Sequence, residues 1–153
     1  ELGELLTEKN LLFTSAESCT GGWVGQSVTG VPGSSKWYGT GFITYSNTAK
    51  TKVLGVKKET LRNFGAVSEE VVCEMVEGAL SLSNSQLGVA ISGIAGPGGG
   101  TKERPVGTVC IAWLREGEEV HSTTELFSGN RNEVRYATVE CALINAIRLI
   151  KEN

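Results

Sequence analysis

The hydrophobic and polar positions along this chain follow two spacings. Continuous or alternating runs of apolar and β-branched residues predict strands, and apolar residues three or four positions apart predict helices. Glycines and a serine cap mark most of the boundaries. The pattern predicts helices over about 1–10, 18–29, 47–54, 57–64 and 130–151, another that begins at 69, and strands over about 11–16, 39–45, 87–96, 107–116 and 119–128.

Two of these helices have distinct signals. Ser68 is a suitable N-cap, with Glu69 and Glu70 in the first turn behind it. The last helix is predicted to place one stripe against the core, formed by Val134, Ala137, Cys141, Ile144 and Ile147. Helices and strands alternate first, and a pair of strands comes late. This order predicts an α/β fold, with residues 1–153 as a single domain built on a mixed β-sheet that has helices on both faces.

Composition narrows the functional classes. The 153 residues have a net charge of −3 and no basic stripe, so we expect no nucleic-acid partner. No apolar run is long enough for a membrane span, and the acidic first ten residues do not resemble a secretory signal. Four cysteines without a C-x-x-C spacing favour a reducing, cytoplasmic setting. The 20 glycines cluster near 21–22, 30–41 and 93–100, which favours close approach of a ligand to the backbone.

The stretch "TSAESCTGG" leads from a predicted strand into a helix. Ser18 is a candidate nucleophile, and the N–H groups of Cys19 and Thr20 are candidate donors to an oxyanion. Gly21 and Gly22 would let a ligand come close. Two alternatives remain open from the residues alone. Ser18 or Thr20 can simply cap the helix, and Cys19, near a helix N-terminus that tends to lower a thiol pKa, is a rival nucleophile.

A serine nucleophile requires a base. The only histidine of the sequence, His121, has polar neighbours and is expected to be solvated, so neither a Ser-His-Asp triad nor a multi-histidine metal site is indicated. Tyr45 and Lys50 follow a predicted strand closely. A buried lysine loses basicity and can accept the serine proton, with Tyr45 as a relay or orienting group. The alternative for Lys50 is an ordinary solvated charge.

Two further segments are candidates for binding. Six glycines lie within the fifteen residues 93–107, and such a loop can bind an anion or a planar ring through its main chain, although it does not match a P-loop. Arg131 and Arg135 lie one turn apart at a helix start, where cations are unfavourable. Either an anionic ligand or partner carboxylate holds them there, or both are solvated.

The segments "AESCTGGWV", "GVPGSSKWYGTGFITYSNTAKTKVLGV", "GAVSEEVV", "SGIAGPGGGTKERPVGTV" and "FSGNRNEVR" together resemble the CinA C-terminal domain family over roughly residues 3–150. The resemblance implies a nicotinamide-nucleotide amidase that hydrolyses nicotinamide mononucleotide through an acyl-enzyme, with Ser18, Tyr45 and Lys50 as catalytic residues and no metal or cofactor. The substrate-binding residues that it implies are Cys19, Thr20, Gly21, Gly22, Ser92, Gly93, Gly96, Gly99 and Arg131.

The resemblance also implies a homo-oligomer, most simply a homodimer. Three positions depart from the family's common pattern, namely Gly98, Arg104 and Asn130, and they affect the expected binding of phosphate and ring rather than the three catalytic residues. Because some family members have little amidase activity, the alternative function is a non-catalytic nucleotide-binding regulatory domain.

Overall fold

Five strands form one mixed sheet in the computed structural model, which describes residues 1–152. They follow the spatial order β2-β1-β3-β4-β5, and β2 and β3 run parallel to β1, whereas β4 and β5 are antiparallel to their neighbours. The strands are β1 (Phe13–Glu17), β2 (Tyr38–Ile43), β3 (Leu87–Gly93), β4 (Thr108–Arg115) and β5 (His121–Leu126). The late antiparallel pair and the mixed sheet confirm the predicted fold class.

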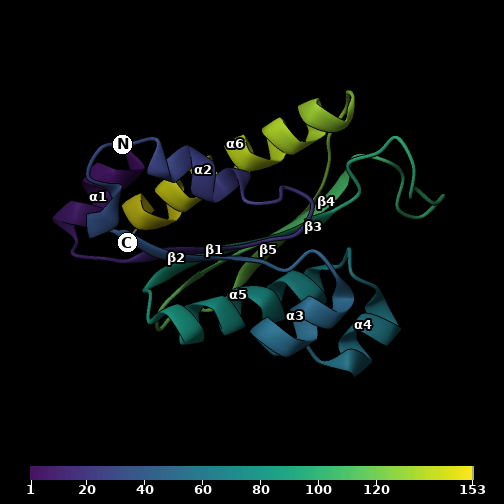
Figure 1. Cartoon of the computed structure of the whole chain (residues 1–153), viewed down its shortest axis with the longest axis horizontal. Helices are drawn as coiled ribbons and strands as arrows, with labels where there is room; N and C mark the ends of the chain where they lie inside the picture. Colours follow the sequence, from purple (N-terminus) through teal and green to yellow (C-terminus); the bar gives the residue numbers. More distant parts are fainter. Residues whose placement is uncertain (153) are drawn as a thin grey trace.

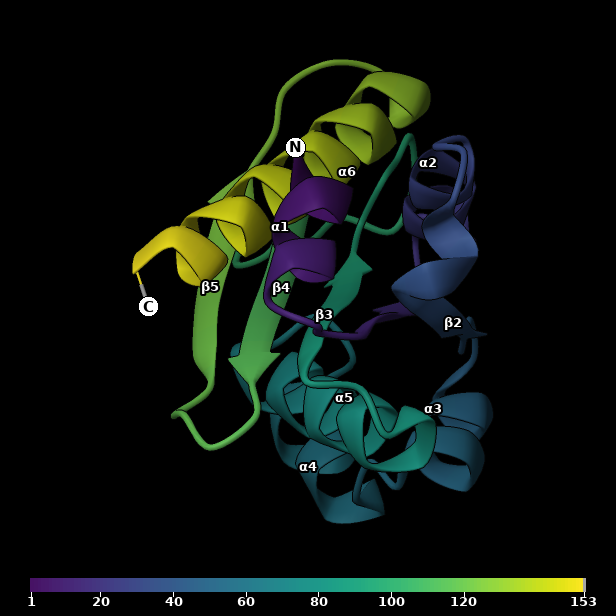
Figure 2. The same ribbon diagram turned by 90° about the vertical axis from the view of Figure 1, so that its left-hand side faces the viewer.

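Helices cover both faces of this sheet (Figure 1). One face carries α1 (Leu2–Glu8), α2 (Trp23–Thr29) and α6 (Arg131–Glu152), with the short helix η1 (Ser34–Lys36) beside them. The other face carries α3 (Asn47–Leu54), α4 (Lys58–Phe64) and α5 (Glu69–Ser83). Figure 2 shows α1 lying against α6 in front of the sheet. The predicted helices are therefore all present, divided between two layers.

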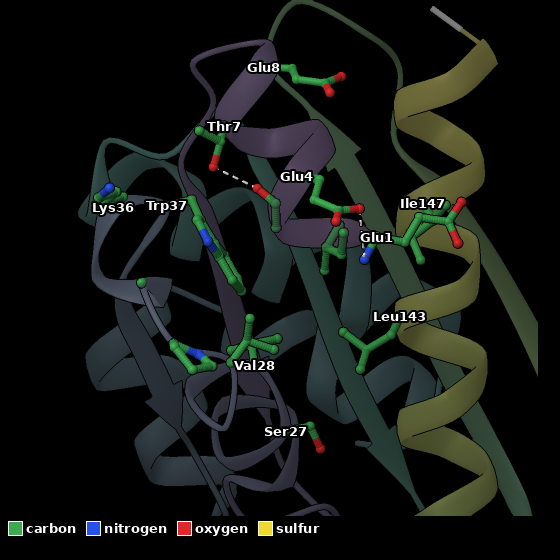
Figure 3. A pocket seen from close by; sticks show the side chains of 15 residues that line it. Glu1, Glu4, Thr7, Glu8, Ser27, Val28, Lys36, Trp37, Leu143 and Ile147 are labelled. Atoms are coloured by element: carbon green, nitrogen blue, oxygen red, sulfur yellow. Dashed lines mark hydrogen bonds and ion pairs between the residues drawn. The ribbon is translucent and has the colours of Figure 1, made fainter.

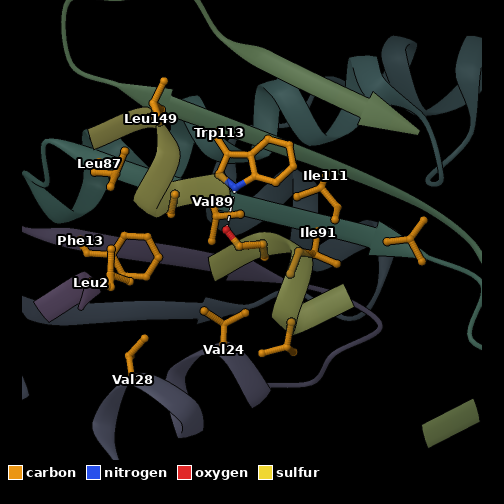
Figure 4. Close-up of a cluster of buried hydrophobic side chains, with 14 of the residues drawn as sticks. Leu2, Phe13, Val24, Val28, Leu87, Val89, Ile91, Ile111, Trp113 and Leu149 are labelled. Carbon is orange, nitrogen blue, oxygen red and sulfur yellow. Dashed lines mark hydrogen bonds between the residues drawn. The ribbon is translucent and has the colours of Figure 1, made fainter. Parts of the chain in front are cut away.

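Each face has its own apolar core. In the core under α6, Phe13 and Ile111 are fully buried, and the Trp113 indole N–H donates to the Ala142 carbonyl at 2.9 Å (Figure 4). Each such fully buried apolar side chain contributes about 1.5–3 kcal/mol. On the opposite face, Met75 and its neighbours on α5 are buried as their spacing predicts. The two cores fix the sheet between the helix layers.

The strand that follows β1 in the sequence, β2, lies on one side of β1 in the sheet, and the next strand, β3, lies on the other side. The chain passes from β1 to β2 through α2 on one face, and from β2 to β3 through α3, α4 and α5 on the other. Because β2, β1 and β3 are parallel, their carboxyl ends meet at one edge of the sheet. Ligands of open α/β sheets bind at such a switch point, outside the carboxyl ends of the strands. This edge is therefore the first place to look for a site.

Three local expectations differ from the structure. The helix expected from 18–20 begins at Trp23, because residues 18–22 form a turn in which Gly21 and Gly22 have positive φ. The strand expected at 39–45 is Tyr38–Ile43, so Tyr45 lies beyond its end. On α6 the prediction for Ile144 was wrong, since it is 43% exposed. The buried face of α6 is instead formed by a neighbouring stripe, which includes Val139, Ala142, Ala146, Leu149 and Ile150.

Candidate active site

Ser18 immediately follows β1 and is nearly buried, with 8% of its surface exposed. Its backbone N–H donates to the Ile91 carbonyl of β3 at 3.0 Å, which extends the sheet pairing by one residue. The Ser18 carbonyl in turn accepts from the Gly21 N–H at 3.0 Å. The serine is therefore held by both neighbouring segments at the carboxyl edge of the sheet, and it does not cap α2.

Lys50 lies on α3, a helix that Ser46 caps by accepting from the Ala49 N–H at 3.0 Å. The Lys50 side chain is 2% exposed, and its Nζ donates to Ser18 Oγ and to the Thr44 carbonyl, both at 3.0 Å. Within residues 1–152 it forms no ion pair. Desolvation therefore lowers the pKa of the Lys50 ammonium group below its ordinary value of 10.5. A solvated surface charge is excluded for this residue.

Tyr45 lies at the rim of the same site and is 63% exposed. Its hydroxyl accepts a hydrogen bond from Arg131 Nη2 at 3.3 Å, and Arg131 Nη1 donates to the Gly96 carbonyl at 2.7 Å. No hydrogen bond joins Tyr45 to Ser18 or Lys50 in the described chain. Ser18 and Lys50 thus contact each other directly, whereas Tyr45 lies at the rim and contacts Arg131 instead.

Cys19 has the chemistry of a buried thiol rather than a reactive one. Burial raises its pKa to about 11, although Arg135 and Lys50 oppose that shift. A thiol with this pKa is protonated at neutral pH, and the thiolate is the nucleophilic form. The expectation that the helix N-terminus lowers the Cys19 pKa is therefore wrong, because desolvation has the larger effect.

Glu17 binds the N-terminus of α2 from the end of β1. The carboxylate is 1% exposed, and its oxygens accept from the Thr20 hydroxyl at 2.7 Å, the Val24 N–H at 2.8 Å and the Gly25 N–H at 3.2 Å. These helix N–H groups are consequently not available to a ligand. A negative charge here is stabilised by the helix dipole as well as by the three donors.

A cavity of about 210 Å³ opens beside the Ser18–Lys50 pair. The lining residues that the sequence had singled out as catalytic or substrate-binding are Ser18, Cys19, Tyr45, Lys50, Ser92, Gly93 and Arg131. The remaining lining residues were not predicted as site residues, and they are Asn47, Ala66, Val67 and Ala95. Ala66 and Val67 follow the end of α4, and only the quoted segment "GAVSEEVV" indicated their importance.

The other predicted binding residues lie outside this lining, and their role stays a prediction. The Thr20 side chain is buried against Glu17, while Gly21 and Gly99 are exposed. Gly22 precedes α2, and Gly96 contributes its carbonyl to Arg131. The glycine loop at 94–107 extends away from the sheet (Figure 1), and Arg104 ties it to α4 by donating to the Phe64 carbonyl at 2.7 Å.

A larger groove of about 680 Å³ lies between α1, η1 and α6 (Figure 3). Trp37 and Val28 form its apolar floor, and Glu1, Glu4 and Glu8 lie along α1 at its margin. The groove is at the amino end of β2, the end of the sheet opposite Ser18. An acidic margin disfavours an anionic ligand, and the groove does not reach the Ser18–Lys50 pair.

No helix within residues 1–152 is both long and apolar enough to cross a bilayer. The family profile of the CinA C-terminal domain matches residues 1–150. The chain is 48% identical to the nicotinamide-nucleotide amidohydrolase PncC of Escherichia coli (strain K12) over 143 residues, which are 94% of this chain and 87% of that protein. It is also 48% identical to the protein of the same name from Pseudomonas putida over 148 residues, which are 97% of this chain and 92% of the relative.

The fold is similar to that of solved structures as well. A crystal structure of a Competence-Damaged Protein (CinA) superfamily protein from Klebsiella pneumoniae superimposes with a TM-score of 0.95 at 35% identity, covering 99% of this chain and 94% of the other. Profile, relatives and structure agree over nearly the whole length. The chain belongs to the CinA C-terminal domain family.

Proposed function

We propose that this chain hydrolyses the carboxamide of nicotinamide mononucleotide to nicotinic acid mononucleotide and ammonia, by acyl transfer through Ser18. One observation carries the chemistry: the Lys50 amine, buried and without a counter-charge in the described chain, lies 3.0 Å from the Ser18 hydroxyl. The choice of substrate rests on the relatives from E. coli and P. putida, which are both named nicotinamide-nucleotide amidohydrolase.

In the acylation step, uncharged Lys50 accepts the Ser18 proton as Oγ forms a bond to the amide carbon. The N–H groups of Cys19 and Thr20 stabilise the resulting oxyanion. Collapse of this intermediate breaks the C–N bond, and the proton held by Lys50 passes to the departing nitrogen. Ammonia leaves, and the acyl group remains as an ester on Ser18.

Deacylation repeats the same proton transfers with water. Lys50, again uncharged, takes a proton from the attacking water, and the new C–O bond produces a second oxyanion. When the ester bond breaks, Lys50 returns the proton to Ser18 Oγ. The products are the carboxylic acid and the enzyme in its starting protonation state. The Thr44 carbonyl, which accepts from Lys50 Nζ at 3.0 Å, keeps the amine directed at Ser18 throughout.

The cavity supports this substrate by its size and lining. At about 210 Å³ it is smaller than the roughly 300–1,000 Å³ of sites that enclose a whole drug-sized ligand. It therefore holds the ring and carboxamide, while the ribose phosphate extends toward the rim. Ala66, Val67 and Ala95 supply apolar contact for the ring. Arg131, a cation at the rim, is suited to the phosphate.

Tyr45 assists from the rim in this proposal. Its hydroxyl accepts from Arg131, and its side chain lines the cavity from which it would approach the leaving nitrogen. The contribution of Tyr45 to catalysis is thus distinct from that of Ser18 and Lys50, which already contact each other.

The test is ammonia release from nicotinamide mononucleotide by the wild-type protein and by Lys50→Ala, each with and without EDTA. We expect release by the wild type and a loss of at least about a hundred-fold in the variant, because a positioned general base contributes roughly 10²–10⁴-fold. Binding of the mononucleotide without ammonia release by the wild type would instead support a nucleotide-binding regulatory domain.

A further inference from the structure

Arg135 reaches from α6 to the loop that follows Ser18. Its Nε donates to the Cys19 carbonyl at 3.0 Å, and its Nη2 donates to the Thr20 carbonyl at 3.1 Å. The guanidinium carbon also lies 5.2 Å from the centre of the Trp23 ring, within the range of a cation–π contact. The planar fork of arginine therefore fixes two successive carbonyl groups at once, with a geometry that a lysine ammonium group does not reproduce.

Fixing a carbonyl also fixes the N–H on the other side of the same peptide group. The peptide between Cys19 and Thr20 is planar and trans, so its C=O and N–H point in opposite directions. With the Cys19 carbonyl held by Arg135, the Thr20 N–H points away from that guanidinium group. The Thr20 hydroxyl, which donates to Glu17 Oε1 at 2.7 Å, restrains the residue from a second side.

The Thr20 N–H has no acceptor among residues 1–152, although Thr20 is fully buried. The Cys19 N–H differs, because it interacts with the thiol of its own side chain, although no other described residue accepts from it. Buried backbone N–H groups without a partner are rare in folded proteins. The unpartnered Thr20 N–H, two residues after a candidate nucleophile, is consistent with an acceptor that is supplied only during the reaction.

We infer that Arg135 is a positioning residue for catalysis: by holding the Cys19 carbonyl, it orients the Thr20 N–H as a donor to the oxyanion that forms at Ser18. This inference rests on the proposed acyl transfer. The cation also polarises the peptide, which strengthens its N–H as a donor. Arg135 does not line the cavity, so it acts through the loop and not on the substrate.

The experiment compares Arg135→Ala and Arg135→Lys with the wild type and with Arg148→Ala. Arg148 is an exposed arginine on the same helix that bonds only Asn145 Oδ1 in the described chain, at 3.2 Å, and serves as the matched control. Loss of a complete oxyanion donor lowers kcat by about 10²–10³-fold. Because the Thr20 N–H is misoriented rather than removed, we expect a fall of roughly 10–100-fold in Arg135→Ala, a smaller fall in Arg135→Lys, and KM within about two-fold of the wild type.

Two further readouts separate positioning from a structural role. Thermal unfolding establishes that the variants are folded, and guanidinium ion at millimolar concentration is expected to restore part of kcat in Arg135→Ala. Wild-type kcat in Arg135→Lys and Arg135→Ala, a rise in KM alone, or a loss of kcat that guanidinium does not reverse would each overturn the inference. An inactive wild type would instead contradict the proposed function, so the two failures are distinguishable.

Discussion

Lys50 Nζ and Ser18 Oγ lie 3.0 Å apart although 32 residues separate them in the sequence. The lysine comes from a helix on one face of the sheet and the serine from the end of the central parallel strand. Both are nearly buried, and the amine has a carbonyl but no carboxylate for a partner within the described residues.

Substitution of the two adjacent nucleophile candidates should have opposite outcomes. We expect Ser18→Ala to lower kcat by several orders of magnitude, because the covalent intermediate can no longer form. Cys19→Ala should retain kcat within a few-fold, since burial raises the Cys19 pKa to about 11 and leaves the thiol protonated. Ammonia release measured at pH 7.5 decides the matter. Loss of turnover in the cysteine variant alone would assign the nucleophile to Cys19.

Activity should depend on the protonation of Lys50. Because the pKa of its ammonium group is lowered by desolvation, we expect kcat/KM to rise with pH along a limb below 10.5 as the base becomes uncharged. Lys50→Arg keeps the charge but cannot lose its proton, so it should lower kcat about 10²–10⁴-fold at every pH. Lys52→Arg, on the exposed side of α3, is the control. A flat profile in the wild type would remove Lys50 from the mechanism.

The same burial should reduce stability. Below its folded-state pKa, Lys50 is protonated in both states, so the folded protein bears the full cost of the desolvated charge. Above that pKa the unfolded chain binds one more proton, up to about its ordinary value of 10.5, and the free energy of unfolding rises with pH. We expect Lys50→Met to be more stable than the wild type at pH 7, by about 1.4 kcal/mol for each unit by which burial lowers the Lys50 pKa.

Urea unfolding between pH 6 and 10 tests this expectation, with Lys52→Met as the matched variant. The excess stability of Lys50→Met should shrink as the pH rises, because the wild type then loses its buried charge. If Lys50→Met proves less stable than the wild type at pH 7, burial of the Lys50 amine does not lower the free energy of unfolding.

Glu17→Gln should weaken the loop that carries the proposed nucleophile, Ser18. The carboxylate accepts from the Thr20 hydroxyl and from the N–H groups of Val24 and Gly25, and a glutamine amide would turn its NH₂ toward at least one of these donors. An unsatisfied buried donor costs about 1–3 kcal/mol. We expect the urea midpoint to fall accordingly and kcat to fall with it. Glu140→Gln, exposed on α6, should change neither.

Much of the fold was predictable because it depends on local pattern. The Ser68 cap formed as expected, with its hydroxyl accepting from the Val71 N–H at 3.3 Å. Gly55 ended α3 with a φ of 74°. Periodicity did not identify every inward residue of α6, however. The predicted stripe and the buried face share Val134 but diverge along the helix, so that Ile144 is exposed whereas Ala146 is buried, because the orientation of the whole helix on the sheet decides which side is covered.

The sequence by itself determined the order of helices and strands, the mixed sheet and the candidates Ser18, Tyr45 and Lys50, since spacing, caps and glycines act over a few neighbouring residues. Only the tertiary structure decided which candidates meet. Parallel strands bring the chain back to the same edge of the sheet, and that return buries Lys50 against Ser18 and leaves Tyr45 at the rim. Desolvation, which sets the pKa of both Lys50 and Cys19, depends on everything packed around them, and no local pattern contains it.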